Sequence, residues 1–177
     1  YVNHLVGQRP LEKLGKPFSA VATELNTGQR VHFVRGNTGL AVRASCSIPG
    51  VFEPVEIRGR KYIDGGVVSP VPVDAARELG GVLIIAVDIS RKATDGSINR
   101  SILGVVGQSI TIMGQKLGEQ ELARADVIIR PKVGKIGATD FDQKNIAILE
   151  GEKAALAAIP EIRQKLAERQ KALQGLK

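Results

Sequence analysis

Alternating apolar and polar residues predict two β-hairpins in the first part of the chain. Phe18–Leu25 and Arg30–Arg35 are the expected strands of the first hairpin, and the turn between them contains Gly28. Val55–Ile57 and Lys61–Ile63 are the expected strands of the second, and the three residues between them include the glycine that tight hairpin turns favour.

The rest of the chain alternates strand and helix patterns. Val82–Val87 and Asp126–Arg130 are short and apolar on both faces, which is typical of strands covered on both sides in a parallel sheet. This alternation predicts an α/β fold, and the sequence shows no internal repeat and no second domain. The expected helices are Thr38–Ser45 with Thr38 as its N-cap, Val73–Leu79, Ile98–Arg124, Gln143–Ile159, and a last helix that begins at Pro160 and runs to about Gln174.

The composition agrees with α/β layers and argues against several kinds of site. Aromatic residues make up 3% of the chain and hydrophobic residues 43%, so the core must be aliphatic. A single cysteine, Cys46, excludes an internal disulfide framework and a cysteine-based zinc site. With two histidines and no clustered carboxylates, no metal site is predicted, and no cofactor is expected.

The formal net charge of +7 raises the question of an anionic partner. The basic residues are dispersed and are not interleaved with aromatic residues, so no nucleic acid partner is predicted. No apolar run reaches the roughly 18 residues that would indicate a membrane-spanning helix. Contact with a membrane surface stays possible, for example through the last helix, where Lys165, Arg169 and Lys171 lie beside Leu166 and Leu173.

The strongest candidate for chemistry is Asp64, which follows a strand and precedes Gly65 and Gly66. Active-site groups of α/β folds gather at strand ends, and two glycines allow a sharp turn and close approach of another segment. The alternative is a plain Asp-Gly turn without chemistry. Asp88, the rival carboxylate, also ends a strand, where capping the next segment is the alternative reading.

The sequence offers no nucleophile to pair with Asp64. No Gly-x-Ser-x-Gly elbow is present, and the nearest match, Gly107–Thr111, lies in a helical pattern and lacks the final glycine. His4 and His32 have no matching serine and aspartate, so a Ser-His-Asp triad is not supported. Neither of the two common glycine-rich phosphate loops occurs.

Several ordered motifs resemble the second half of a patatin-like phospholipase domain. The similarity is strongest to the bacterial acylesterase branch related to neuropathy target esterase, and it covers about residues 15–160. Residues 1–177 are therefore interpreted as the C-terminal part of a single such domain, with 161–177 as a terminal helix. The motifs that carry the resemblance are Ala22–Gly28, Ala41–Val55, Asp64–Val73 and Gly80–Asp88.

The resemblance implies a three-layer α/β/α sandwich and a carboxylic ester hydrolase with a Ser-Asp dyad. Asp64 takes the place of the catalytic aspartate, with Gly65 and Gly66 beside it, and Ser47 and Pro49 match a Ser-x-Pro element that packs near the active site. The family's glycine-rich oxyanion loop and serine elbow precede this region. The N-terminal half of the same domain is thus the expected partner, and this chain alone is expected to be inactive.

The expected substrate is a lipid or another ester, and the resemblance leaves homo-oligomer formation open. Two alternatives stand beside hydrolysis. One is a non-catalytic binding or regulatory module that kept the fold, and the other is a basic protein that binds membrane surfaces.

Overall fold

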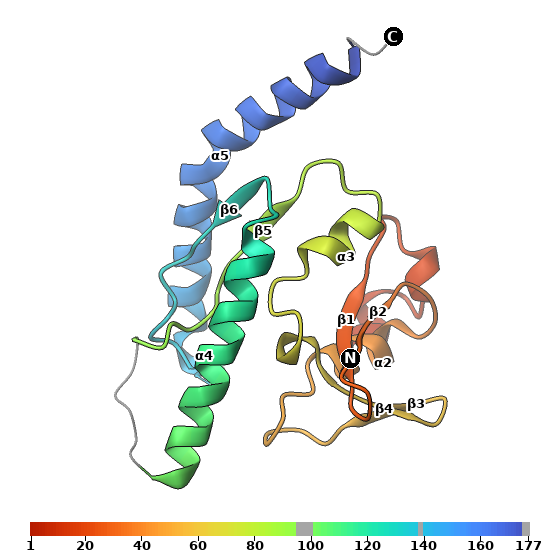
Figure 1. The fold of residues 1–177 in the computed structure, drawn as a ribbon. Coiled ribbons are helices and arrows are strands. Elements are labelled where there is room, and N and C mark those ends of the chain that lie inside the picture. The colour runs from red at the N-terminus through yellow and green to blue at the C-terminus, as the bar shows by residue number, and fades with distance from the viewer. Residues whose placement is uncertain (95–100, 138–139, 175–177) are drawn as a thin grey trace. The chain divides into compact units, whose positions relative to one another are not determined.

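The computed structural model describes residues 1–94, 101–137 and 140–174 (Figure 1). The chain forms two compact units, Tyr1–Gly81 and Val82–Lys177, which are described separately. Helices and strands are mixed along the chain, in agreement with the predicted α/β class.

A four-stranded antiparallel sheet forms the centre of the first unit. Its strands are β1 (Ala20–Glu24), β2 (Arg30–Phe33), β3 (Val55–Ile57) and β4 (Arg60–Asp64), in the order β2-β1-β4-β3. Both predicted hairpins are confirmed, and β1 joins them because it pairs with β2 on one side and β4 on the other. All five residues of β1 are buried.

The turn between β3 and β4 is tighter than the sequence predicted. Ile57 pairs with Arg60, so only Arg58 and Gly59 form the loop. Their φ angles are 52° and 75°, as in a type I′ turn, where both central residues have positive φ. A left-handed conformation at a residue other than glycine costs on the order of 1 kcal/mol, so Arg58 is strained.

Helix α2 (Thr38–Ser45) packs on this sheet (Figure 1). Its N-cap is Asn37, whose Oδ1 accepts a hydrogen bond from Leu40 N at 2.8 Å, so the prediction of Thr38 was wrong by one residue. The Thr38 hydroxyl instead donates to Arg9 O at 2.7 Å. One core cluster between helix and sheet consists of Ala22, Ala44, Val55 and Tyr62, with Val31, Phe33, Leu40 and Ile57 packed against it.

Short helical elements complete the first unit. The predicted helix after Pro72 is confirmed as α3, one residue shorter than expected. The short helical elements of the first unit are α1 (Val2–Leu5), η1 (Leu11–Lys13), η2 (Gly65–Val67) and α3 (Val73–Glu78).

The second unit contains a two-stranded parallel sheet, formed by β5 (Ile85–Val87) and β6 (Val127–Ile129). The predicted parallel pairing is confirmed, but both strands are shorter than expected. The expectation that β5 is covered on both faces is wrong within the described residues. Ala86 is buried, whereas Ile85 is 41% and Val87 52% exposed.

Two long helices lie in this unit, together with the short η3 (Phe141–Gln143). Helix α4 (Ile102–Leu122) begins after Ser101, whose hydroxyl accepts from Gly104 N at 3.1 Å, and the predicted start at Ile98 lies outside the described residues. Helix α5 (Lys144–Gln174) continues through Pro160, where the sequence predicted two helices. Strong helix formers on both sides of Pro160 outweigh the roughly 3 kcal/mol that an interior proline costs. In the described part of the chain, none of the helices combines the length and hydropathy that crossing a membrane requires.

Candidate functional site

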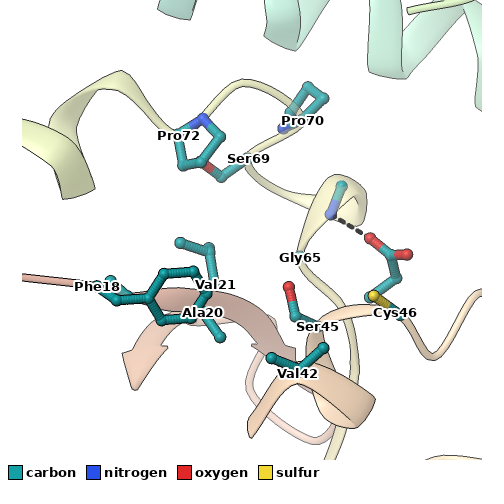
Figure 2. A pocket seen from close by; sticks show the side chains of 13 residues that line it. Phe18, Ala20, Val21, Val42, Ser45, Cys46, Gly65, Ser69, Pro70 and Pro72 are labelled. Carbon is teal, nitrogen blue, oxygen red and sulfur yellow. Dashed lines mark hydrogen bonds between the residues drawn. The ribbon is translucent and has the colours of Figure 1, made fainter. Parts of the chain in front are cut away.

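Asp64 lies at the C-terminal end of β4, as predicted, and three hydrogen bonds hold it. Its N–H donates to Ser47 O and its C=O accepts from the Thr23 hydroxyl, both at 2.9 Å. Its carboxylate Oδ1 accepts from Gly66 N at 2.7 Å, the dashed line in Figure 2. Thr23 is buried, so the main chain of Asp64 is anchored from within the fold while the residue itself is only half-buried.

The two glycines after Asp64 have different roles. A Cβ atom on Gly65 would lie 2.3 Å from Val21 O, so only glycine lets η2 approach β1 this closely. Gly66 contributes the N–H that binds the Asp64 carboxylate, and a Cβ atom there would lie 3.1 Å from Asp64 Oδ1. The close approach that the two glycines predicted is therefore confirmed at Gly65.

The Ser-x-Pro element supports Asp64 only through its serine. Ser47 is buried, and its hydroxyl donates to Arg43 O at 2.8 Å near the end of α2, while its carbonyl binds Asp64. Pro49 is exposed and does not line the pocket at Asp64. The structure thus brings Ser47 to Asp64 by a backbone contact and leaves Pro49 outside the site.

A pocket of about 350 Å³ opens beside Asp64 (Figure 2). Its walls are mostly apolar, with a few hydroxyl groups among them, and Ser19 Oγ is buried without a hydrogen-bond partner among the described residues. A plain turn explains the bond between Asp64 and Gly66 but not this pocket. The lining residues are Phe18, Ser19, Ala20, Val21, Val42, Ser45, Cys46, Asp64, Gly65, Gly66, Ser69, Pro70 and Pro72.

Cys46 and Thr23 are the site residues that sequence reasoning missed. Cys46 is exposed as a residue, but partial burial of its thiol raises the pKa, and the nearby Asp64 carboxylate raises that pKa further. Thr23 holds the Asp64 carbonyl. Both residues lie inside motifs that the sequence singled out, but neither position indicates its role, because the contacts join segments that are distant in the chain.

The rival candidates have structural partners of their own. Asp88 accepts a hydrogen bond from Ser90 N at 3.0 Å and forms an ion pair with Arg130 at 3.4 Å, which supports the capping interpretation. Ser109, in the nearest match to an elbow, lies inside α4 and donates to Val105 O. His32 Nε2 lies 3.1 Å from Glu78 Oε2. The described residues contain no group of three side chains suited to hold a metal ion.

Comparison with known proteins shows that the Asp64 site lies in a part of the chain that matches a known protein family. The sequence model of the family described as patatin-like phospholipase matches residues 6–77, which include Ser47 and the Asp64 motif. An uncharacterized NTE family protein of Mycobacterium tuberculosis is 42% identical over 89 residues, which cover 50% of this chain and 25% of that protein. A second such protein from this organism is 28% identical over 182 residues, covering 89% of this chain and 31% of that protein.

A mammalian protein is also similar to this chain. Patatin-like phospholipase domain-containing protein 7 of Mus musculus is 34% identical over 98 residues, which cover 53% of this chain and 7% of that protein. The chain therefore spans less than a third of the length of these relatives. The resemblance to patatin-like phospholipases of the NTE type is confirmed.

Gly65→Ala should destabilise the first unit by about 1–3 kcal/mol or more, because the new methyl group would overlap the Val21 carbonyl in a packed region. Gly66→Ala is the matched control. Its methyl group would meet only the end of the Asp64 side chain, so the expected change is about 0.5 kcal/mol or less. The free energy of unfolding in urea measures both, and equal losses would contradict the role assigned to Gly65.

Asp64→Asn should lower the pKa of the Cys46 thiol, because the substitution removes the carboxylate charge that disfavours the thiolate. More thiolate is then present at a given pH, so iodoacetamide should label Cys46 faster at pH 8. The labelling rate is read by mass spectrometry of the peptide that contains Cys46. An unchanged rate would show that Asp64 does not act on the thiol.

Proposed function

We propose that this chain supplies the catalytic aspartate, Asp64, of a serine hydrolase that cleaves the ester bonds of lipids. One observation carries the proposal. Asp64 lines a largely apolar pocket, and hydrogen bonds to Ser47 and Thr23 hold its main chain. This site lies inside the segment that matches the patatin-like phospholipase family. The similarity to that family supports the class of reaction, lipid acyl hydrolysis.

In the proposed reaction, a serine hydroxyl attacks the acyl carbonyl of the ester while Asp64 accepts its proton. The proton then passes to the departing alcohol, and an acyl-serine ester remains. Asp64 next takes a proton from water as the water oxygen attacks the acyl carbon. It returns that proton to the serine oxygen when the acyl–serine bond breaks, which releases the fatty acid and restores the serine. Gly66 N fixes Oδ1 of Asp64, whereas Oδ2 has no hydrogen-bond partner among the described residues and is free to accept the proton.

The serine and the donors that stabilise the oxyanion would come from the N-terminal half of the same domain. These 177 residues contain no Gly-x-Ser-x-Gly motif. A nucleophile elbow presents its serine on a sharp turn, and backbone N–H groups nearby stabilise the negative oxygen. The pocket beside Asp64 provides the side from which such a turn could approach the carboxylate.

The surface of the second unit supports this partner. A two-stranded sheet is not stable by itself, and parallel strands are normally buried on both faces. β5 nevertheless exposes Ile85 and Val87. Large apolar side chains are also exposed on α4, at Ile102, Leu103, Val105, Val106, Ile110, Ile112 and Met113.

A membrane would cover these side chains but could not satisfy the N–H and C=O groups along the outer edge of β5, which pair with no strand among the described residues. A further strand of the same domain satisfies both requirements. We therefore propose that the N-terminal half extends this sheet and completes a three-layer α/β/α sandwich. An edge strand is a ready template for pairing with a further strand, which a surface patch made only of side chains is not.

Asp64→Asn in the full-length protein tests the catalytic role. The asparagine keeps an oxygen that can accept from Gly66 N, so the local structure should persist while the proton acceptor is lost. We expect hydrolysis of p-nitrophenyl esters and lysophosphatidylcholine to slow by about 10²–10⁴-fold. Asp88→Asn is the control, because this rival carboxylate is paired with Arg130, and its activity should stay within a few-fold of the parent.

Near-parental activity of Asp64→Asn would overturn the assignment. Absence of ester hydrolysis in the parent protein, with Asp64→Asn folded, would instead favour the non-catalytic binding module. In that case the hydrogen bond from Gly66 N to Asp64 Oδ1 would have only a structural role, as in a plain turn.

Hydrogen exchange of two neighbouring amides tests the proposed sheet partner. Asp88 N donates to Ile129 O, and N–H groups alternate in direction along a strand, so Val87 N–H points to the other edge of β5. In the full-length protein we expect Val87 N–H to exchange as slowly as Asp88 N–H. Fast exchange at Val87 with slow exchange at Asp88 would show that no strand covers this edge.

A further inference from the structure

A second cleft of the first unit, about 1,070 Å³ in volume, lies along the N-terminal part of α2 and the β3–β4 hairpin. It shares no lining residue with the pocket beside Asp64. Its lining residues are Glu12, Phe33, Arg35, Gly36, Asn37, Leu40, Ala41, Glu56, Ile57, Arg58, Arg60 and Tyr62.

Part of this cleft is apolar. Phe33 and Tyr62 pack edge to face, with ring centroids 5.1 Å apart and an interplanar angle of 75°. Leu40 and Ile57 are partly buried and pack against the core cluster that contains Tyr62. Tyr62 is buried, so Phe33, Leu40 and Ile57, which are only partly buried, offer the surface on which an alkyl chain can bury apolar area.

The charged part of the cleft holds three arginines and two glutamates. Within the described residues, no hydrogen bond or ion pair holds the guanidinium groups of Arg35, Arg58 and Arg60. The two carboxylates of the cleft have neighbours of their own. Glu12 accepts from Gly36 N at 2.8 Å, and Arg35 nearby helps to lower its pKa, while Glu56 lies opposite Lys61 in the β-ladder. Arg60 likewise lies close enough to Glu24 to help lower its pKa. The cleft therefore presents fork-shaped cationic donors, which suit phosphate and carboxylate groups.

The conformation of Arg58 is a second and independent observation. With a φ of 52°, it occupies a turn position that glycine, asparagine or aspartate normally fills. Nothing in the folding of the hairpin requires an arginine there, because glycine would adopt the same angles without strain. Residues held in strained conformations cluster at functional sites, and Arg58 lines the cleft.

We propose that this cleft binds an anionic amphiphile, a single-chain lipid with a phosphate or carboxylate head group. The head group lies on Arg35, Arg58 and Arg60, and the alkyl chain lies against the partly buried side chains of Phe33, Leu40 and Ile57. This site is separate from the Asp64 pocket and goes beyond the proposed hydrolysis. Binding and hydrolysis can therefore fail independently, because binding does not use Asp64.

Calorimetric titration of the full-length protein with dodecyl phosphate, below its micelle concentration, tests the site. Arg58→Gly removes one guanidinium and also relieves the strained φ angle, so the variant should fold at least as stably as the parent. We expect its Kd to rise about tenfold or more, the usual effect of losing a charged hydrogen bond. Arg35→Gln, which acts from outside the hairpin, should weaken binding in the same direction.

Arg163→Gln on α5 is the matched control, because it removes the same charge from an exposed position in the other unit. Its Kd should equal that of the parent. Equal weakening in Arg58→Gly and Arg163→Gln would overturn the site in favour of general charge attraction, and so would a lack of binding by the parent.

Three comparison ligands separate the possible sources of the signal. Laurate should bind like dodecyl phosphate, whereas inorganic phosphate and dodecyl maltoside should each bind at least tenfold more weakly. Equal binding of inorganic phosphate would overturn the role of the apolar surface. Sedimentation with phosphatidylglycerol vesicles, in the absence of dodecyl phosphate binding, would assign the arginines to a bilayer surface and overturn the proposal.

Discussion

The contact between Gly65 and the Val21 carbonyl is the constraint on which the site depends. It presses η2 against the central strand β1, which is possible only because position 65 has no Cβ atom. The Asp64 backbone is then held between two segments, by Thr23 of β1 and by Ser47 after α2. Long-range contacts thus fix the main chain of Asp64, and its own turn fixes the carboxylate.

Strand β1 connects this site to the rest of the first unit. Its five residues are buried, and the strand pairs with β2 and β4, so β1 sets the register of both hairpins. At its end, Glu24 accepts hydrogen bonds from Asn26 N and Thr27 N, which shape the turn into β2. The Thr27 hydroxyl and these N–H groups lower the pKa of Glu24, as expected for a carboxylate that organises a turn.

Sequence patterns predicted what depends on neighbours along the chain and missed what depends on distant segments. The hairpins, the helix at 38–45 and the strand end at Asp64 follow from local alternation and glycine placement. The role of Thr23 does not, since its bond to Asp64 spans 41 positions. Pro160 was misjudged because the helix formers on both sides outweigh a single proline, and the exposure of Val87 could not be read from a strand that looks buried on both faces.

The same hydrogen bonds that make Asp64 a good turn residue also make it a candidate base, and this explains why the motif alone is ambiguous. An Asp-Gly-Gly turn needs the bond from Gly66 N to Oδ1, and a base needs one oxygen fixed and the other left available. What separates the two roles is the surroundings. A structural turn gains nothing from an apolar pocket, because desolvating a carboxylate is costly without a compensating partner. A carboxylate that must take a proton from a hydroxyl gains from it, because exclusion of water strengthens that interaction. The pocket beside Asp64, and not the turn, is therefore the observation that supports the proposed role of Asp64 as a base.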